Sequence, residues 1–395
     1  MTMHGKNKMN RALSFDSYNR EKLKNLREKS IDEQHTKKDA ISALYPPHIL
    51  VTTQDRTFEA IKQLGSGNFA DVLLVKENGK ELAIKLFRNE RSEEECYKLW
   101  KEESDMMRAI GYFKHPNLLA FHSVGQLESE TARYRKNFIM MDYAGLSLFD
   151  IMEATKARNT HLEQFAFRIS TIRDVGSQIA SGMKALDDKK ILHLDLKPEN
   201  VFLKNPKFVV NYVVEEGICY VEISDTSVVV GDFGCSRVSL VNETNELAQT
   251  QNYRAPEVFI GLPLTKTVDV WSFGCIIYEM YTFELLFYGN NNLSDSEAVQ
   301  FDMMQRTVRQ EPTPRMMREA SERSTELSVR DYNSVYMIEE ITSKPELVMP
   351  LYKNRRPGDK AAFDLFATLE KILTFDPYRR PSFAEILEFA FFKLK

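Results

Sequence analysis

The stretch from His193 to Asn200 reads HLDLKPEN and places a carboxylate, an ammonium and a carboxamide within a few residues. These polar groups belong to Asp195, Lys197 and Asn200, and a hydrophobic run, Val201 to Leu203, follows directly. Pro and Asn are common in turns and neighbouring charges are usually solvated, so an ordinary polar turn is one interpretation. The other is half of an active site, in which a carboxylate beside a cation serves proton transfer and charge stabilisation.

A glycine-containing stretch nearer the N-terminus could bind phosphate. In GSGNFADV, residues 65–72, the glycines allow backbone N–H groups to approach phosphates, and Val72 could pack on a flat base. The third glycine of the GxGxxG pattern is replaced by Ala70. Strands flank the stretch, which argues against a dinucleotide-binding Rossmann site, because that site needs a helix after the glycines.

A lysine at the end of an apolar run is the next candidate. Lys85 closes the run Ala83-Ile84-Lys85, where a lysine usually extends its ammonium group to solvent. If Lys85 pointed into a cleft instead, it would need an acidic partner. Glu103 is the first candidate for this partner and Glu102 is the second.

The elements that must position these residues fall into two groups. The first is an antiparallel meander with an Asn78-Gly79 turn, followed by one helix and two further strands; the second is mainly helical. The strands are expected at residues 58–64, 71–76, 81–87, 118–124 and 138–142, and the helices at 92–110, 171–187 and 268–282. We therefore expect an α+β fold with a small β-rich lobe and a larger α-rich lobe, and ligands commonly bind between such lobes.

Composition sets limits on the class of protein. The chain has 395 residues, is 43% hydrophobic and carries a formal net charge of −4, so it can bury a large core and has no global basic field for nucleic acid. Four separated cysteines without a CxxC pair argue against a zinc site or disulfide framework. No signal peptide or membrane-spanning run is visible. We expect a monomer in the cytoplasm, the nucleus or both, without direct contact to nucleic acid or membrane.

Four further motifs follow HLDLKPEN along the chain. They are Asp232-Phe233-Gly234, Ala255-Pro256-Glu257, DVWSFG at 269–274 and DPYRRP at 376–381. In this order the motifs resemble the signature set of the eukaryotic protein kinases, from about Phe58 to the C-terminus. The resemblance implies the two-lobed protein kinase fold, with an antiparallel β-sheet plus one helix in the small lobe.

The resemblance also implies domain boundaries. Residues 1–56 are polar and poor in aromatics, so composition predicts a mostly disordered or partly helical extension. By the resemblance, residues 57–395 would be the kinase domain, with an N-lobe at 57–144 and a C-lobe at 145–395. An insert-like region is expected at 285–357.

Each motif residue then acquires an expected role in phosphoryl transfer, which needs neutralised phosphate charge and an in-line hydroxyl. Lys85 would hold the α- and β-phosphates of ATP and pair with Glu103, while Asp232 and Asn200 would bind Mg²⁺. Asp195 would orient the hydroxyl of a protein Ser or Thr and accept its proton, and Lys197 would stabilise the transferred phosphoryl group. Thr250 occupies the position that contacts Asp195 and Lys197 in serine/threonine kinases. The remaining nucleotide contacts are assigned to Leu64, Gly65, Ser66, Gly67, Asn68, Phe69, Ala70, Val72, Ala83, Met141, Asp142, Tyr143, Ala144 and Phe202.

The segment from Tyr253 to Ser272 resembles the CMGC group, close to the homeodomain-interacting and dual-specificity tyrosine-regulated kinases. By that resemblance, Arg254 shapes a site that prefers proline after the target residue. Two departures from the family pattern concern regulation. Leu194 replaces the arginine that usually binds a phosphorylated activation loop, and Leu247 replaces a tyrosine that is autophosphorylated in the nearest relatives. A third is a long connection between Asn200 and Asp232, which predicts an added β-hairpin.

Two alternatives to a protein serine/threonine kinase are left open. A pseudokinase scaffold, suggested by Leu194, Ala70 and the long insert, would bind ATP or partners without efficient turnover. Small-molecule phosphotransfer on a kinase-like fold is less favoured, because such enzymes lack the APE and DxWSxG elements that build the peptide-binding lobe.

Overall fold

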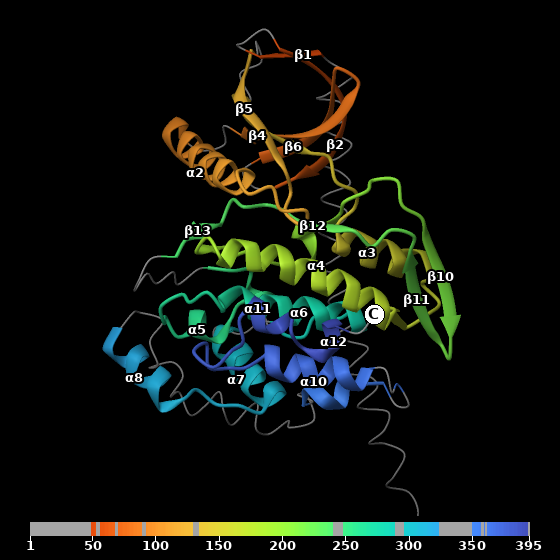
Figure 1. The fold of residues 1–395 in the computed structure, drawn as a ribbon, viewed down its shortest axis with the longest axis vertical. Coiled ribbons are helices and arrows are strands. Elements are labelled where there is room, and N and C mark those ends of the chain that lie inside the picture. The colour runs from red at the N-terminus through yellow and green to blue at the C-terminus, as the bar shows by residue number, and fades with distance from the viewer. Residues whose placement is uncertain are drawn as a thin grey trace, which may run out of the picture. The chain divides into compact units, whose positions relative to one another are not determined.

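The computed structural model describes residues 49–52, 56–67, 70–88, 92–128, 134–239, 248–288, 296–323, 350–356, 359 and 362–393. The chain divides into two compact units (Figure 1). The first is Met1–Trp100 with His122–Met141, and the second is Lys101–Phe121 with Asp142–Lys395. Within the described ranges, no helix has both the length and the apolar character that a membrane span requires.

The first unit contains a closed β-barrel with the strand order β1-β2-β3-β4-β6-β5. Side chains alternate across its strands, so that Leu73 and Val75 of one strand and Ile84 of the next face a shared apolar core. The rings of Phe58 and Phe138 meet edge to face in this core at 5.8 Å. The strands are β1 (Ile49–Thr52), β2 (Thr57–Ser66), β3 (Ala70–Glu77), β4 (Lys80–Arg88), β5 (Phe121–Glu128) and β6 (Tyr134–Asp142).

The predicted Asn-Gly turn is confirmed. Asn78 and Gly79 connect β3 to β4 with φ angles of 50° and 82°, the left-handed conformation that a tight hairpin turn requires. Helix α2 (Glu93–Gly111), also predicted, is attached to the barrel by Trp100, whose indole Nε1 donates to the carbonyl of Phe138 at 3.1 Å.

The sequence missed one strand in this part of the chain and placed the start of another too early. Ile49–Thr52, within the extension expected to be disordered, forms β1, which pairs with both β2 and β5. Residues 1–48 lie outside the described residues. The strand expected at residues 118–124 begins only at Phe121, because Leu118 and Leu119 bond instead to Val230, far along the chain. Strand β1 pairs with its sequence neighbour β2 and also with distant β5, and Leu118 pairs with distant Val230. The distant pairings are not contained in a local pattern.

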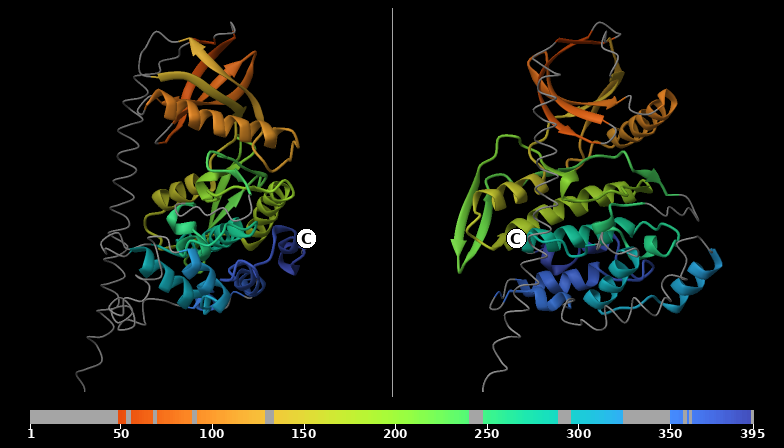
Figure 2. Two further views of the ribbon diagram at one scale, coloured as in Figure 1. Left: turned by 90° about the vertical axis from the view of Figure 1, so that its left-hand side faces the viewer. Right: turned by 180° about the vertical axis from the view of Figure 1, so that it is seen from behind.

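The second unit is mainly helical and is built around α6 (Val268–Thr282). Every residue of this helix from Val268 to Tyr281 is buried, as expected for a helix that is covered on all sides. It packs against α4 (Ile169–Asp187), and the two helices lie side by side in Figures 1 and 2. The other helices among the described residues are α3 (Leu148–Arg158), α5 (Pro256–Phe259), α7 (Ser296–Val308), α8 (Pro314–Arg323), α10 (Ala362–Ile372), α11 (Phe383–Ile386), α12 (Ala390–Lys393) and the 3-10 helices η1 (Pro198–Asn200), η2 (Gln251–Tyr253) and η4 (Leu351–Asn354).

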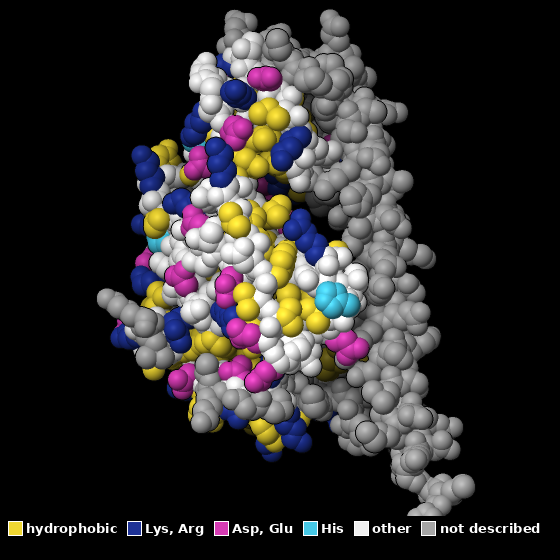
Figure 3. Space-filling model, turned by 90° about the vertical axis from the view of Figure 1, so that its right-hand side faces the viewer, with side chains coloured by type: hydrophobic (Ala, Val, Ile, Leu, Met, Phe, Trp, Pro, Cys, Tyr) yellow, Lys and Arg dark blue, Asp and Glu magenta, His cyan; other side chains and the backbone are white. Residues whose placement is uncertain are grey.

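The β-hairpin predicted between Asn200 and Asp232 is present. It consists of β10 (Val210–Glu215) and β11 (Ile218–Ile223), and Figures 1 and 2 show it at the edge of the second unit. The sequence did not indicate that β11 also pairs, in parallel, with β7 (Gln164–Phe167). Arg168, directly after β7, bonds to Glu215 at 2.7 Å and Glu222 at 3.1 Å and so fixes the hairpin to the body. Seen in a space-filling view of this side, hydrophobic, acidic and basic side chains are interspersed (Figure 3).

A buried ion pair joins Glu257 and Arg380 in the second unit. The guanidinium donates to both carboxylate oxygens at 2.7 and 2.8 Å, and both side chains are fully buried. The remaining guanidinium N–H groups donate to the carbonyls of Thr267, Thr374 and Phe375, so all five donors are satisfied. This pair joins α5 to the segment that precedes α11.

We predict that Glu257→Gln lowers the free energy of unfolding by about 3–5 kcal/mol, because it leaves the Arg380 charge buried without its counter-charge. Urea unfolding monitored by circular dichroism measures the change. The matched control is Glu388→Gln, which removes a largely exposed partner of Lys393 and should change stability by less than about 1 kcal/mol. Equal effects of the two variants would contradict the prediction.

Candidate active site

A buried carboxylate on α6 holds the backbone of the HLDLKPEN stretch. Asp269 accepts the N–H of His193 at 2.7 Å and that of Leu194 at 2.9 Å. Leu194 has a φ of 63° and is 1% exposed, so a β-carbon-bearing residue is held in a left-handed conformation inside the unit. Asp269 therefore fixes a strained turn immediately before Asp195.

The imidazole of His193 connects this turn to the residue before Asp232. Its Nδ1 accepts the N–H of Asp195 at 3.2 Å, so Nδ1 carries no proton. Its Nε2 must then be the protonated nitrogen, and it donates to the carbonyl of Gly231 at 3.1 Å. One side chain thereby links two parts of the chain that carry predicted catalytic residues.

Asp195, Lys197 and Thr250 form a hydrogen-bonded cluster, as the resemblance implied. The ammonium of Lys197 lies 2.9 Å from Asp195 Oδ2 and donates to Thr250 Oγ1 at 3.1 Å, and Thr250 Oγ1 donates to Asp195 Oδ1 at 2.6 Å. Burial would lower the pKa of Lys197, but the Asp195 carboxylate outweighs burial and raises it. The lysine is thus a fixed cation beside a carboxylate.

Strand pairing brings Asn200 and Asp232 to the same place. Asn200 directly precedes β9 (Val201–Leu203), and Asp232 follows β12 (Val228–Val230), which pairs antiparallel with β9 so that Val230 lies opposite Val201. A further bond joins the N–H of Gly231 to the carbonyl of Asn200 at 2.9 Å. The Nδ2 of Asn200 also donates to the backbone carbonyl of Asp195 at 2.7 Å and to its Oδ2 at 3.1 Å.

The donor set here suits Mg²⁺ bound with phosphates. The side-chain nitrogen of Asn200 donates to Asp195, so the side-chain carbonyl oxygen of Asn200 is left as an acceptor. The Asp232 carboxylate supplies charged oxygens, and Mg²⁺ is a hard cation that binds oxygen ligands. Among the described residues, no group of three or more His, Cys, Asp or Glu side chains could hold a metal. Mg²⁺ usually takes only one or two protein carboxylates and completes its coordination with substrate phosphates and water, so the two chain ligands fit.

Glu103 of α2 lies beside the Asp232-Phe233-Gly234 motif. A β-carbon placed on Gly234 would come within 3.0 Å of the Glu103 carboxylate and 3.4 Å of Asp232 Oδ1. The carboxylate of Glu103 is buried, with the residue 6% exposed. The close approach explains the glycine, whereas the pairing of Glu103 with Lys85 stays a prediction.

In the first unit, the predicted phosphate-binding residues share one face of the sheet. Val72 lies opposite Gly65 on one side and Lys85 on the other, so the three occupy one row across β2, β3 and β4. Ala83 lies two residues before Lys85 and therefore on the same face. This face is opposite to the one whose side chains form the barrel core.

The other predicted nucleotide contacts are placed as follows. In the first unit, Leu64, Ser66, Gly67 and Ala70 flank the glycine turn, which is closed by a bond from the N–H of Gly67 to the carbonyl of Ala70 at 2.9 Å, and Met141 is buried at the end of β6. In the second unit, Asp142 donates its N–H to the carbonyl of Ala120, Tyr143 and Ala144 follow it, and Phe202 is half-buried in β9. Asn68, Phe69 and Leu247 lie outside the described residues.

Helix α6 also holds the segment that follows Leu247. Gln249 donates from Nε2 to Ser272 Oγ at 2.9 Å, and Tyr253 donates from its hydroxyl to Glu279 at 2.7 Å. Burial and the neighbouring Glu279 raise the pKa of Tyr253, so the tyrosine remains a neutral donor. The segment carrying Thr250 is thereby fixed to the same helix as the catalytic turn.

Sequence reasoning missed the partner that holds Arg254. Its guanidinium donates from Nη1 to Glu297 of α7 at 2.7 Å, from Nε to the carbonyl of Ala248 at 3.1 Å and from Nη2 to that of Gln249 at 3.3 Å. Gln249 has a φ of 67°. No local signal connects Glu297 to Arg254, because the pair depends on how α7 packs.

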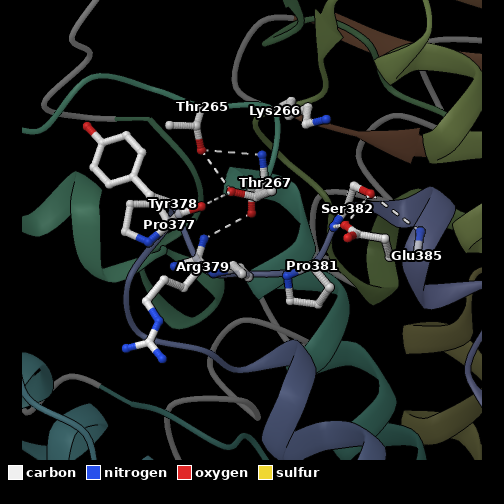
Figure 4. A pocket seen from close by; sticks show the side chains of 10 residues that line it. Thr265, Lys266, Thr267, Pro377, Tyr378, Arg379, Pro381, Ser382 and Glu385 are labelled. Atoms are coloured by element: carbon white, nitrogen blue, oxygen red, sulfur yellow. Dashed lines mark hydrogen bonds between the residues drawn. The ribbon is translucent and has the colours of Figure 1, made fainter.

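A cavity of about 440 Å³ lies elsewhere in the second unit (Figure 4). It is lined by Thr265–Thr267, Pro377–Ser382 and Glu385, and the Thr267 hydroxyl closes one wall by donating to the carbonyl of Pro377 at 2.7 Å. None of the residues predicted for catalysis lines it. Arg380, which pairs with Glu257, is one of the residues that line the cavity.

The second unit contains a carboxylate beside a cation and a pair of side chains whose oxygens would fit Mg²⁺, and the first unit contains a glycine turn. Phosphoryl transfer needs groups of these types. The protein kinase domain family model matches residues 58–392. The chain belongs to the protein kinase family, and the predicted fold class is confirmed.

Individual relatives agree with this assignment. Serine/threonine-protein kinase AFC2 of Arabidopsis thaliana is 28% identical over 85% of this chain and 76% of its own length. Dual specificity protein kinase CLK2 of Mus musculus is 28% identical over 87% of this chain, which spans 65% of that protein. A crystal structure of a kinase domain has 26% identity, covers 87% of this chain and 96% of the solved one, and gives a TM-score of 0.69. The relatives support the CMGC resemblance and an ATP-dependent protein serine/threonine kinase.

A second acid close to Asp269 provides a prediction about pH. Burial raises the pKa of Asp187, at the end of α4, to about 8, with a further contribution from Asp269 that Lys266 partly offsets. Asp187 Oδ1 is buried and has no hydrogen-bond partner among the described residues. The folded protein therefore binds a proton that the unfolded chain releases near pH 4, and stability falls as pH rises from about 4 to 8.

We predict that Asp187→Asn, which keeps the shape without the charge, stabilises the protein by about 1 kcal/mol or more at pH 8 and has little effect at pH 4. Urea unfolding at both pH values measures the difference. A loss of stability that is equal at the two pH values would show that the carboxylate is not the cause.

Proposed function

We propose that this kinase transfers the γ-phosphate of ATP to serine or threonine hydroxyls through the cluster around Asp195. The observation that supports this most directly is the mutual hydrogen bonding of Asp195, Lys197, Thr250 and Asn200. A carboxylate fixed in this way can orient a hydroxyl and accept its proton, and general-base catalysis contributes about 10²–10⁴-fold to a rate. Lys197 provides positive charge for the phosphoryl group in transit.

The two units would contribute different parts of the machinery. Asn200 and Asp232 of the second unit would hold Mg²⁺, which when bound neutralises phosphate charge. In the first unit, the backbone of Gly65–Gly67 and the ammonium of Lys85 would bind the phosphates, and Val72 and Ala83 would cover the adenine. Glu103 would orient Lys85.

The direct test compares phosphate transfer from ATP to a basic protein substrate by wild type and by Asp195→Asn. We expect the variant to retain Mg²⁺-ATP binding and the wild-type melting temperature, and to lose about 10²-fold or more in rate, because the amide accepts no proton. Wild-type rates in the variant would contradict the role of Asp195. Binding of ATP without transfer by wild type would favour the pseudokinase alternative.

We further propose that the substrate residue after the target is preferably proline. Arg254 already uses the carbonyls of Ala248 and Gln249, so those acceptors are occupied where the peptide would lie. A residue with a backbone N–H would leave that donor unpaired there, at a cost of about 1–3 kcal/mol. Proline has no N–H and avoids the cost.

Peptides that differ only in proline or alanine after the target serine test this proposal. Wild type should prefer proline by about fivefold or more in kcat/KM, and Arg254→Gln, which releases the carbonyls, should reduce the ratio. The control Arg158→Gln changes an exposed arginine of α3 and should leave the ratio unchanged. A ratio near one in wild type, or one unaffected by Arg254→Gln, would contradict the proposal.

A further inference from the structure

A buried charge network lies next to the glycine turn, in the first unit. Asp71, the second residue of β3, is fully buried. Its carboxylate accepts from the guanidinium of Arg88 through Nε at 2.9 Å and through Nη2, and from Gln63 Nε2 at 3.1 Å. A buried carboxylate persists only when it is paired and hydrogen-bonded in this way, so the three side chains are held in a defined geometry.

The network reaches both strands that flank the turn. Gln63 Nε2 also donates to the carbonyl of Gly65 at 3.1 Å, and Arg88 Nη2 donates to the hydroxyl of Ser66. Gln63, Gly65 and Ser66 belong to β2, Asp71 to β3 and Arg88 to β4. Side chains from three strands are therefore joined at the base of Gly65–Gly67.

An irregularity in the sheet makes such support necessary. The register of β2 against β3 shifts between Gln63 and Gly65, so the ladder of backbone bonds is interrupted immediately before the turn. The bond from the Gln63 side chain to the Gly65 carbonyl lies at this interruption. It satisfies a backbone acceptor at the point where the strand pairing changes.

The network acts from the face opposite to the predicted nucleotide contacts. Asp71 lies opposite Leu86, a residue of the barrel core, and opposite Ser66. The neighbours Ala70 and Val72 point to the other face, together with Lys85. The network therefore does not occupy the face that carries Val72 and Lys85. It includes Ser66, one of the predicted nucleotide contacts, and holds the backbone of the glycine turn from the other face.

We propose that Arg88, Asp71 and Gln63 are positioning residues that hold the glycine turn in the conformation that binds the phosphates of ATP. This inference rests on the proposed function. The bulged strand end would otherwise move freely, and the backbone N–H groups of Gly65–Gly67 would lose their common orientation. The role predicts a defect that depends on the phosphates and not on the adenosine part of the ligand.

The test uses Arg88→Gln and, as a milder change, Gln63→Met in the full chain. Titration calorimetry measures binding of Mg²⁺-ATP, and inhibition of phosphate transfer measures binding of adenosine. Both variants should bind Mg²⁺-ATP more weakly, Arg88→Gln by about tenfold. Adenosine binding, and kcat at saturating ATP, should stay within about twofold of wild type.

The matched control is Arg56→Gln in the same barrel. Arg56 also forms a two-pronged ion pair, donating to Glu77 at 2.9 and 3.0 Å, but it does not contact the turn. It should lose stability like the test variants without a selective loss of Mg²⁺-ATP binding. Equal weakening of ATP and adenosine, or an ATP affinity unchanged in both test variants, would overturn the positioning role.

A failure of the proposed function would give a different result from a failure of the positioning role. Wild type would then transfer no phosphate, whatever the variants bind. Wild-type transfer combined with unchanged ATP binding in Arg88→Gln and Gln63→Met would leave the kinase assignment intact and remove only the positioning role.

Discussion

The catalytic part of this kinase depends on one fully buried carboxylate that receives two backbone N–H groups. Asp269 lies on α6 and holds His193 and Leu194 in the turn that presents Asp195. Burial raises the pKa of Asp269, which opposes its charge, while the two backbone N–H bonds favour it. The left-handed conformation of Leu194 is held by these bonds, so the position of Asp195 is set by α6 and not by the local sequence alone.

The same helix organises the segment that carries Thr250. Ser272 and Glu279 of α6 hold Gln249 and Tyr253, and between these two residues lies Thr250, which bonds to Asp195 and Lys197. Two segments far apart in the chain thus meet because both attach to one rigid buried element. Glu297 of α7 completes the arrangement by pairing with Arg254.

Motifs assigned Asp195, Lys197, Asn200 and Asp232 to the candidate site, and their roles in catalysis and metal binding stay predictions. The Asn78-Gly79 turn was predicted from a local backbone requirement and is confirmed. Features that depend on distant packing were not predictable: β1, the pairing of β11 with β7, the Glu297 partner of Arg254, and the network around Asp71. From the sequence alone, charged residues such as Asp71 and Arg88 are interpreted as solvated side chains. Only the strand register of the structure brings the two together.

We propose that Asp269 holds the turn that carries Asp195 without a phosphorylated activation loop, because buried Leu194 occupies the position that, by the family resemblance, holds a phosphate-binding arginine. The most direct measurement compares the phosphate-transfer rate before and after complete dephosphorylation of the enzyme, verified by mass spectrometry and followed by removal of the phosphatase. The rate should stay within about twofold. A loss of about tenfold or more that is reversed when the enzyme is phosphorylated again would contradict the claim.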